Sequence, residues 1–116
     1  MANTITVSST ERGKVQFQGA FSDMWRVTGS VTDSNAVAAT TIGEFDITVP
    51  GVALGDMVLG MAFGADFDDG TDQASPTAYV AAANTVTIQW SADDAEFAAD
   101  ALNGATFKML IGRPGW

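Results

Sequence analysis

The chain has 116 residues and a formal net charge of −9, and it contains neither cysteine nor histidine. This length fits one domain with its own core, and the lack of cysteine excludes disulfide bonds. The lack of histidine removes the commonest general base and the commonest transition-metal ligand.

Charge is unevenly distributed along the chain. All the basic residues lie toward the two ends, and between Val27 and Phe107 there are twelve acidic residues and no basic one. The basic residues are Arg12, Lys14, Arg26, Lys108 and Arg113. Because nucleic acids and anionic membranes carry negative charge, we expect neither as a partner. The acidity itself is also what solubility requires.

Neither a signal peptide nor a membrane span is expected. The first residues have no basic start and no apolar run. The most apolar window, Val49–Phe63, is too short to cross a bilayer and contains Pro50 and Asp56. The sequence therefore predicts a soluble protein.

Apolar and polar residues alternate along most of the chain, which is typical of β-strands. In the N-terminal third, the alternation predicts strands around residues 4–7, 14–18 and 25–31. A turn is expected at Glu11-Arg12-Gly13, between the first two of these strands. The small and polar stretch Asp33–Thr41 is expected to be a flexible loop.

The alternation continues through the rest of the chain, at residues 45–49, 57–63, 78–82, 85–90 and 107–111. The stretch "AYVAAANTVTIQW", residues 78–90, predicts a β-hairpin with one buried face. Ala83-Asn84 lies where the hairpin must reverse, and asparagine tolerates the left-handed backbone that tight turns need. Trp90 is in phase with Val86 and Ile88 and is therefore expected in the core.

These elements predict an all-β protein with about eight short strands. The expected architecture is a single antiparallel β-sandwich, jelly-roll-like, or a small barrel, formed by one domain over residues 1–116. Residues 1–41 are an additional strand pair or arm in this interpretation. Ser91-Ala92-Asp93-Asp94 favours a short helix near residues 92–102, and the alternative is an irregular loop.

The acidic loop "DFDDGTD", Asp66–Asp72, is the best candidate for a metal site, since calcium prefers several oxygen ligands on a turning backbone. Its glycine is misplaced for an EF-hand, and Thr77 stands where the bidentate glutamate belongs. An exposed acidic turn is the preferred interpretation, and neither a metal nor a cofactor is expected.

We also expect no enzymatic activity. Serine and threonine have no histidine to activate them, and neither a nucleophile elbow nor a phosphate-binding loop is present. Carboxylate pairs such as Asp93 with Asp94, or Asp94 with Glu96, are common on a surface this acidic.

The aromatic residues Trp25, Trp90, Trp116 and Tyr79 allow a sugar-stacking platform as an alternative to core packing. Trp116 follows Arg113-Pro114-Gly115 at the end of the sequence. Two interpretations of Trp116 remain open: its side chain is tucked into the fold, or it is docked on a neighbouring molecule.

Three stretches together resemble small β-proteins encoded among tailed-phage structural genes. They are "VPGVALGDMVL" (Val49–Leu59), "AYVAAANTVTIQW" (Ala78–Trp90) and "FKMLIGRP" (Phe107–Pro114). The resemblance covers residues 45–114 and is to capsid decoration (cement) proteins and related head-fibre or tail modules.

The resemblance implies a virion structural protein on the outer surface of the capsid, with the major capsid protein as partner and a homotrimer as the assembly. In this interpretation Arg12, Lys14 and Arg26 face the capsid, whereas Arg113 and Trp116 make inter-subunit contacts. The alternatives are a tail or fibre β-sandwich that binds host glycans and a generic tail or neck protein.

Overall fold

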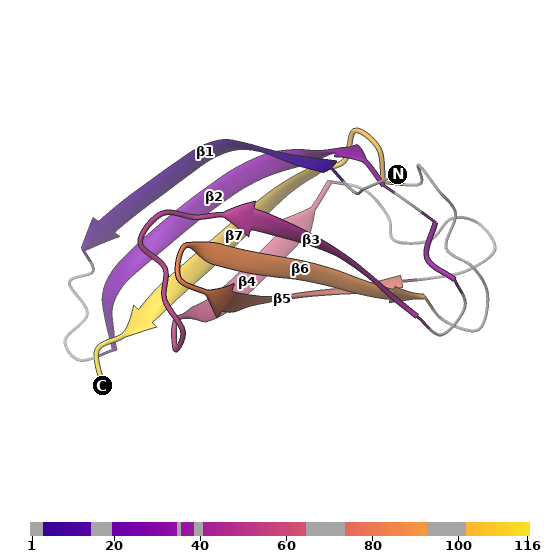
Figure 1. Ribbon diagram of the computed structural model, residues 1–116. Helices are drawn as coiled ribbons and strands as arrows, with labels where there is room; N and C mark the ends of the chain where they lie inside the picture. The colour runs from indigo at the N-terminus through magenta and orange to yellow at the C-terminus, as the bar shows by residue number, and fades with distance from the viewer. Residues whose placement is uncertain (1–3, 15–19, 35, 39–40, 65–73, 93–101) are drawn as a thin grey trace.

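The computed structural model describes residues 4–14, 20–34, 36–38, 41–64, 74–92 and 102–116. Within these ranges, seven strands form two antiparallel sheets that face each other (Figure 1). The four-stranded sheet has the order β1 (Thr4–Lys14), β2 (Phe21–Asp33), β7 (Thr106–Pro114) and β4 (Met57–Phe63). The three-stranded sheet has the order β3 (Ile42–Thr48), β6 (Thr85–Ala92) and β5 (Ala74–Ala82). The predicted all-β fold is confirmed, with seven strands in the described ranges rather than about eight.

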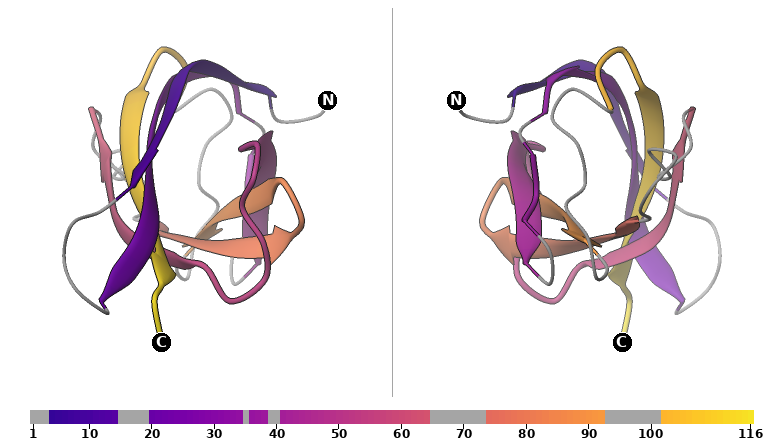
Figure 2. Two further views of the ribbon diagram at one scale, coloured as in Figure 1. Left: turned by 90° about the vertical axis from the view of Figure 1, so that its left-hand side faces the viewer. Right: turned by 90° about the vertical axis from the view of Figure 1, so that its right-hand side faces the viewer.

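Two hairpins, β1–β2 and β5–β6, stay within one sheet, and the other connections cross between the sheets. The last strand, β7, lies between β2 and β4. Seen end-on, the sheets enclose a common interior in a sandwich-like arrangement (Figure 2). Their margins approach each other where β4 contacts β5 and where β1 contacts β3.

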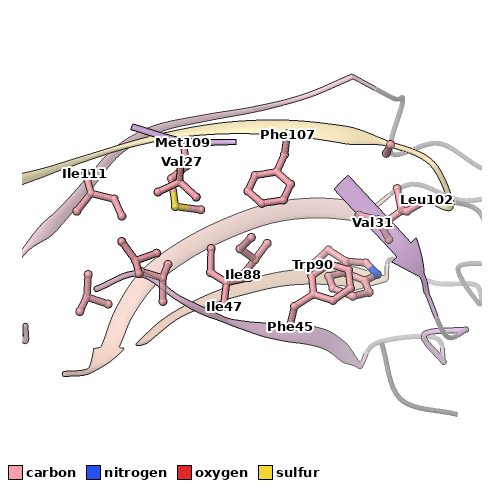
Figure 3. Close-up of a cluster of buried hydrophobic side chains, with 14 of the residues drawn as sticks. Val27, Val31, Phe45, Ile47, Ile88, Trp90, Leu102, Phe107, Met109 and Ile111 are labelled. Carbon is pink, nitrogen blue, oxygen red and sulfur yellow. The ribbon is translucent and has the colours of Figure 1, made fainter. Parts of the chain in front are cut away.

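The alternating apolar residues form one core between the sheets (Figure 3). Both sheets contribute fully buried side chains, among them Trp25, Val27, Phe107, Ile111, Val86, Ile88 and Trp90. The rings of Phe45 and Trp90 lie 4.5 Å apart between centroids, close enough for favourable aromatic packing. Each large apolar side chain removed from water contributes about 1.5–3 kcal/mol, so this shared core is the main stabilising feature.

The predicted β5–β6 hairpin is confirmed. Ala82 pairs with Thr85, so that Ala83-Asn84 forms the two-residue connection. Asn84 has a φ of 62°, in the left-handed region that asparagine tolerates. Trp90 is buried, as its phase with Val86 and Ile88 predicts.

The predicted turn at Glu11-Arg12-Gly13 is wrong, because β1 continues through these residues to Lys14. β2 is 13 residues long and supplies cross-strand partners for this whole segment. Glu11 pairs with Arg26, and Arg12 pairs with Trp25. Cross-strand pairing therefore outweighs the local turn preference. Of the strand predicted at residues 14–18, only Lys14 lies within the described residues.

The short helix expected near residues 92–102 lies mostly outside the described residues. Ala92 is the last residue of β6, and Leu102 is fully buried. The stretch Asp33–Thr41 differs from a simple exposed loop: Asp33 ends β2, and both Ser34 and Val37 are buried.

Candidate functional site

The five residues predicted to make contacts do not form one surface. Arg12 near the end of β1 and Arg113 near the end of β7 come together over the Trp25 ring. Both strands end on the side of the molecule where the C-terminus lies (Figure 1). Arg26 lies on the opposite face of the four-stranded sheet, because it is one residue out of phase with the buried Trp25. Lys14 ends β1 in register with Asp23.

Arg12 and Arg113 belong to a cluster that we call the arginine corner: Arg12, Asp23, Trp25, Asp56 and Arg113. Asp23 is buried, and its Oδ2 atom lies 2.5 Å from Arg12 Nη2 and 3.8 Å from Arg113 Nη1. Both guanidinium groups also lie over the Trp25 ring, at 4.7 and 5.1 Å from its centroid. The corner thus joins β1, β2 and β7 by ionic and cation–π contacts.

Arg113 additionally binds the loop between β3 and β4. Its Nε and Nη2 atoms each donate a hydrogen bond of 2.9 Å to the Asp56 carboxylate, and Nη2 donates a further one of 2.8 Å to the Gly51 carbonyl. Burial by itself raises the pKa of Asp56. The bonds from Arg113 and the Ala53 amide, with the charges of Arg113 and Arg12, outweigh burial and lower this pKa below its ordinary value. The hydrogen bonding between Arg113 and Asp56 also raises the pKa of Arg113.

Asn84 fastens the β5–β6 turn to this loop. Its side-chain Oδ1 accepts a 2.8 Å hydrogen bond from the Gly51 amide, and its backbone bonds to both Val49 and Val52. Trp25 Nε1 donates a 3.0 Å bond to the Pro50 carbonyl. The three stretches that carry the sequence resemblance therefore meet at this corner.

The arginine corner holds the β3–β4 loop and the adjoining strand ends in place. Its two carboxylates both accept from guanidinium groups, so the charges are compensated and the loop backbone is held by hydrogen bonds. This arrangement fixes the ends of strands from both sheets relative to each other. Sequence reasoning missed the roles of Asp23, Asp56 and Gly51, because their partners are distant in the chain.

A second feature is a groove of about 490 Å³ on the outer face of the four-stranded sheet, which we call the outer-sheet groove. It crosses all four strands, and its lining includes Ser9, Glu11, Arg26, Thr28, Gly60, Ala62, Lys108 and Leu110. Arg26 forms an ion pair with Glu11, and both side chains are mostly exposed. Lys108 is exposed and has no ion-pair partner among the described residues.

The aromatic residues do not form a common platform. Trp25 and Trp90 are buried in the core, which corrects the sugar-stacking alternative for these two residues. Tyr79 on β5 is 45% exposed, and its hydroxyl oxygen lies 3.4 Å from Gln89 Nε2. Trp116 is 87% exposed and thus is not tucked into the fold of this chain.

The acidic loop Asp66–Asp72 lies within residues 65–73, outside the described ranges. Among the described residues, no group of three or more acidic side chains is placed to hold a metal ion. No helix in the described ranges has the length and apolarity needed to cross a membrane.

Comparison with known proteins returned no relative. No protein-family model, no curated protein and no solved structure matches the chain.

Proposed function

We propose that the chain is a virion structural protein that decorates and stabilises the outer surface of a tailed-phage capsid, as a homotrimer bound to the major capsid protein. The sequence resemblance described above suggests this role. The distribution of charge in the structure is the observation that carries it.

All five basic residues of the sequence lie on three neighbouring strands of one sheet, β1, β2 and β7. The three-stranded sheet carries only two charged residues, Glu44 and Asp46, and both are acidic and exposed. The strands of one sheet thus hold every cation, together with Glu11, Asp23 and Asp33, whereas the described strands of the other sheet hold acidic charge alone. This difference favours the four-stranded sheet as the side that meets a partner, and the acidity of the chain keeps the decorated particle soluble.

The strand order supports a short jelly roll as the finer description of the fold. The strands pair from the outside of this part of the chain inward. β2 lies beside β7, β3 lies beside β6, and β4 contacts β5 at the margin of the two sheets. Jelly rolls occur in viral capsid proteins and in lectins, so this support is an analogy of fold.

The stabilising mechanism follows from linkage. A protein that binds the assembled, expanded shell and not its separated subunits stabilises the shell by mass action. The arginine corner contributes indirectly, because it fixes the β3–β4 loop and the strand ends and so stabilises the fold that carries the contact surface. No reacting group is needed for this function.

The test is co-sedimentation of the purified protein with expanded, undecorated heads of the phage that encodes it, with stoichiometry read from the pelleted bands. We expect saturation at a copy number comparable to that of the major capsid protein. Heads that are already fully decorated serve as the control and should bind no more. A handful of bound copies, or none, would contradict decoration.

The second candidate function is glycan binding. Tyr79 and Trp116 favour it, because exposed aromatic rings are typical of glycan-binding surfaces. A tail or fibre module that binds host glycans would retain sugars on a glycan array. Tyr79→Ala should then lose this binding, and binding to heads should be absent.

A further inference from the structure

The outer-sheet groove is built from two rows of side chains that cross the four-stranded sheet. One row runs through Glu11, Arg26, Leu110 and Gly60, which are cross-strand partners in that order. The next row runs through Ser9, Thr28, Lys108 and Ala62. Residues between the rows, such as Val27 and Met109, point into the core. Val27, Met61 and Met109 also line the groove from between the rows, so the groove lies on the outer face with these strand residues as its floor.

The groove is the place where positive charge is left over on an acidic molecule. Its two cations, Arg26 and Lys108, oppose one carboxylate, Glu11, whereas the whole chain has a net charge of −9. Arg12 and Arg113 are already engaged by Asp23 and Asp56 in the arginine corner.

Arg26 and Lys108 are diagonal neighbours on β2 and β7, because Arg26 pairs with Leu110 two residues away from Lys108. Diagonal positions are about 7–8 Å apart, so one short acidic segment is able to reach both cations. Arg26 already has Glu11 as an ion-pair partner, which leaves Lys108 as the main site for a carboxylate from another molecule.

The shape of the groove favours an extended segment. At the β4 end it is lined by Gly60 and Ala62, whose small size lets an incoming backbone approach, and Leu110 offers an apolar contact. From β1 to β4 the groove crosses three interstrand spacings, about 14 Å, which is the length of about four extended residues. Its volume falls within the range of specific ligand pockets.

We propose that the outer-sheet groove binds an extended acidic segment, about four residues long, of the protein that this chain decorates. This inference rests on the proposed function and specifies which surface makes the contact and what chemistry it recognises. A carboxylate of the segment binds Lys108, a second one shares Arg26 with Glu11, and an alternating apolar side chain lies against Leu110.

The binding test uses a synthetic hexapeptide of alternating glutamate and valine, followed by nuclear magnetic resonance. We expect saturable shifts of the backbone amides of Gly60, Lys108 and Leu110, and no such shifts with a lysine–valine hexapeptide. Lys108→Gln should weaken binding about three- to tenfold, since one charge contact is lost. Affinity should also fall at about 0.5 M salt, because exposed charge contacts are screened.

Thr77→Glu is the matched control. Thr77 is exposed on β5 in the other sheet, and this substitution lowers the net charge by one unit, as Lys108→Gln does. The control should bind the hexapeptide as the wild type does. Equal weakening by both variants, or the absence of shifts at the groove, would overturn the inference. Lys108 has no ion-pair partner among the described residues, so the thermal midpoint of Lys108→Gln should equal that of the wild type.

The same variants separate this inference from the function on which it rests. If wild type saturates undecorated heads and Lys108→Gln does so with unchanged affinity, the groove is not the contact, although decoration stands. If the hexapeptide binds the groove but wild type does not sediment with heads, decoration fails and an acidic-peptide site remains. A loss of oligomer mass in Lys108→Gln, measured by ultracentrifugation, would identify a second copy of the chain as the occupant and overturn the inference.

Discussion

Arg113 connects three separate parts of the chain through a single guanidinium group. It binds Asp56 by two hydrogen bonds, approaches the buried Asp23 and lies over Trp25. Its side chain is 30% exposed, whereas that of Asp56 is 3% exposed. Removing Arg113 would therefore leave a buried carboxylate without its main partner, which is far more costly than losing a surface pair.

We expect Arg113→Ala to lower the free energy of unfolding by about 2–3 kcal/mol. Arg26→Ala is the matched control, because Arg26 pairs with Glu11 where both side chains are more than half exposed. The control should change stability by less than about 1 kcal/mol. Urea denaturation followed by tryptophan fluorescence measures both variants. Equal losses would show that the corner contributes no more than a surface ion pair.

Asp56 also makes the stability of the protein depend on pH. Its pKa in the folded state is lowered, so the unfolded chain binds a proton more readily than the folded one. The contribution of Asp56 is complete above about pH 5 and is lost as the pH falls below about 4 and then through the lower pKa of the folded state. The difference in unfolding free energy between wild type and Asp56→Asn should therefore shrink on acidification.

Urea titrations at about pH 7, 5, 4 and 3 measure this difference. In an Arg113→Ala background, Asp56→Asn should produce a much weaker dependence on pH, because the main hydrogen bonds that lower the pKa are gone. A difference that stays constant over the whole range in the wild-type background would contradict this role for Asp56.

At the scale of elements, the loop between β3 and β4 is the part that the corner holds in place. Gly51 and Gly55 within it both have positive φ, of 93° and 99°. A Cβ atom at Gly51 would overlap Arg12 Nη1, whereas a Cβ at Gly55 meets no atom within 4 Å. The two positions thus share a backbone requirement and differ in their contact with the corner.

Gly55→Ala should cost about 1–2 kcal/mol, the strain of a left-handed residue with a Cβ. Gly51→Ala should cost at least about 1 kcal/mol more, because Arg12 must leave its position against Asp23 and Trp25. Thermal unfolding of the two variants measures the difference. If the costs are equal, Arg12 moves freely and the corner is looser than its distances imply.

Local patterns predicted the elements better than the site. The alternation of Val86, Ile88 and Trp90 and the turn residue Asn84 are local signals, and both were confirmed. The turn expected at residues 11–13 failed because β2 offers partners that no local pattern reveals. The corner could not be predicted for the same reason. Arg113 reaches Asp23 only through the register of β2 with β7, and it reaches Asp56 only through the loop that follows β3.

At the scale of the whole molecule, the strand order brings basic residues that are scattered in the sequence onto one sheet. In the sequence, the five basic residues merely lie toward the two ends. In the fold, the strands from both ends come together as β1, β2 and β7. The acidic middle of the chain supplies the three-stranded sheet with its only two charges. An acidic segment of a partner would therefore be attracted to the four-stranded sheet rather than to the other sheet.

The position of β7 also determines when the protein is able to fold. It is the last of the seven strands in sequence, yet it lies inside the four-stranded sheet and carries the buried Phe107 and Ile111. During synthesis on a ribosome, the edge of β2 that pairs with β7 stays unpaired, and its apolar side chains Trp25, Val27 and Val31 stay partly uncovered, until residues up to Pro114 have emerged. A nascent chain that stops before Thr106 has no strand to place between β2 and β4. Until then the uncovered apolar row of β2 is a surface on which nascent chains are able to aggregate.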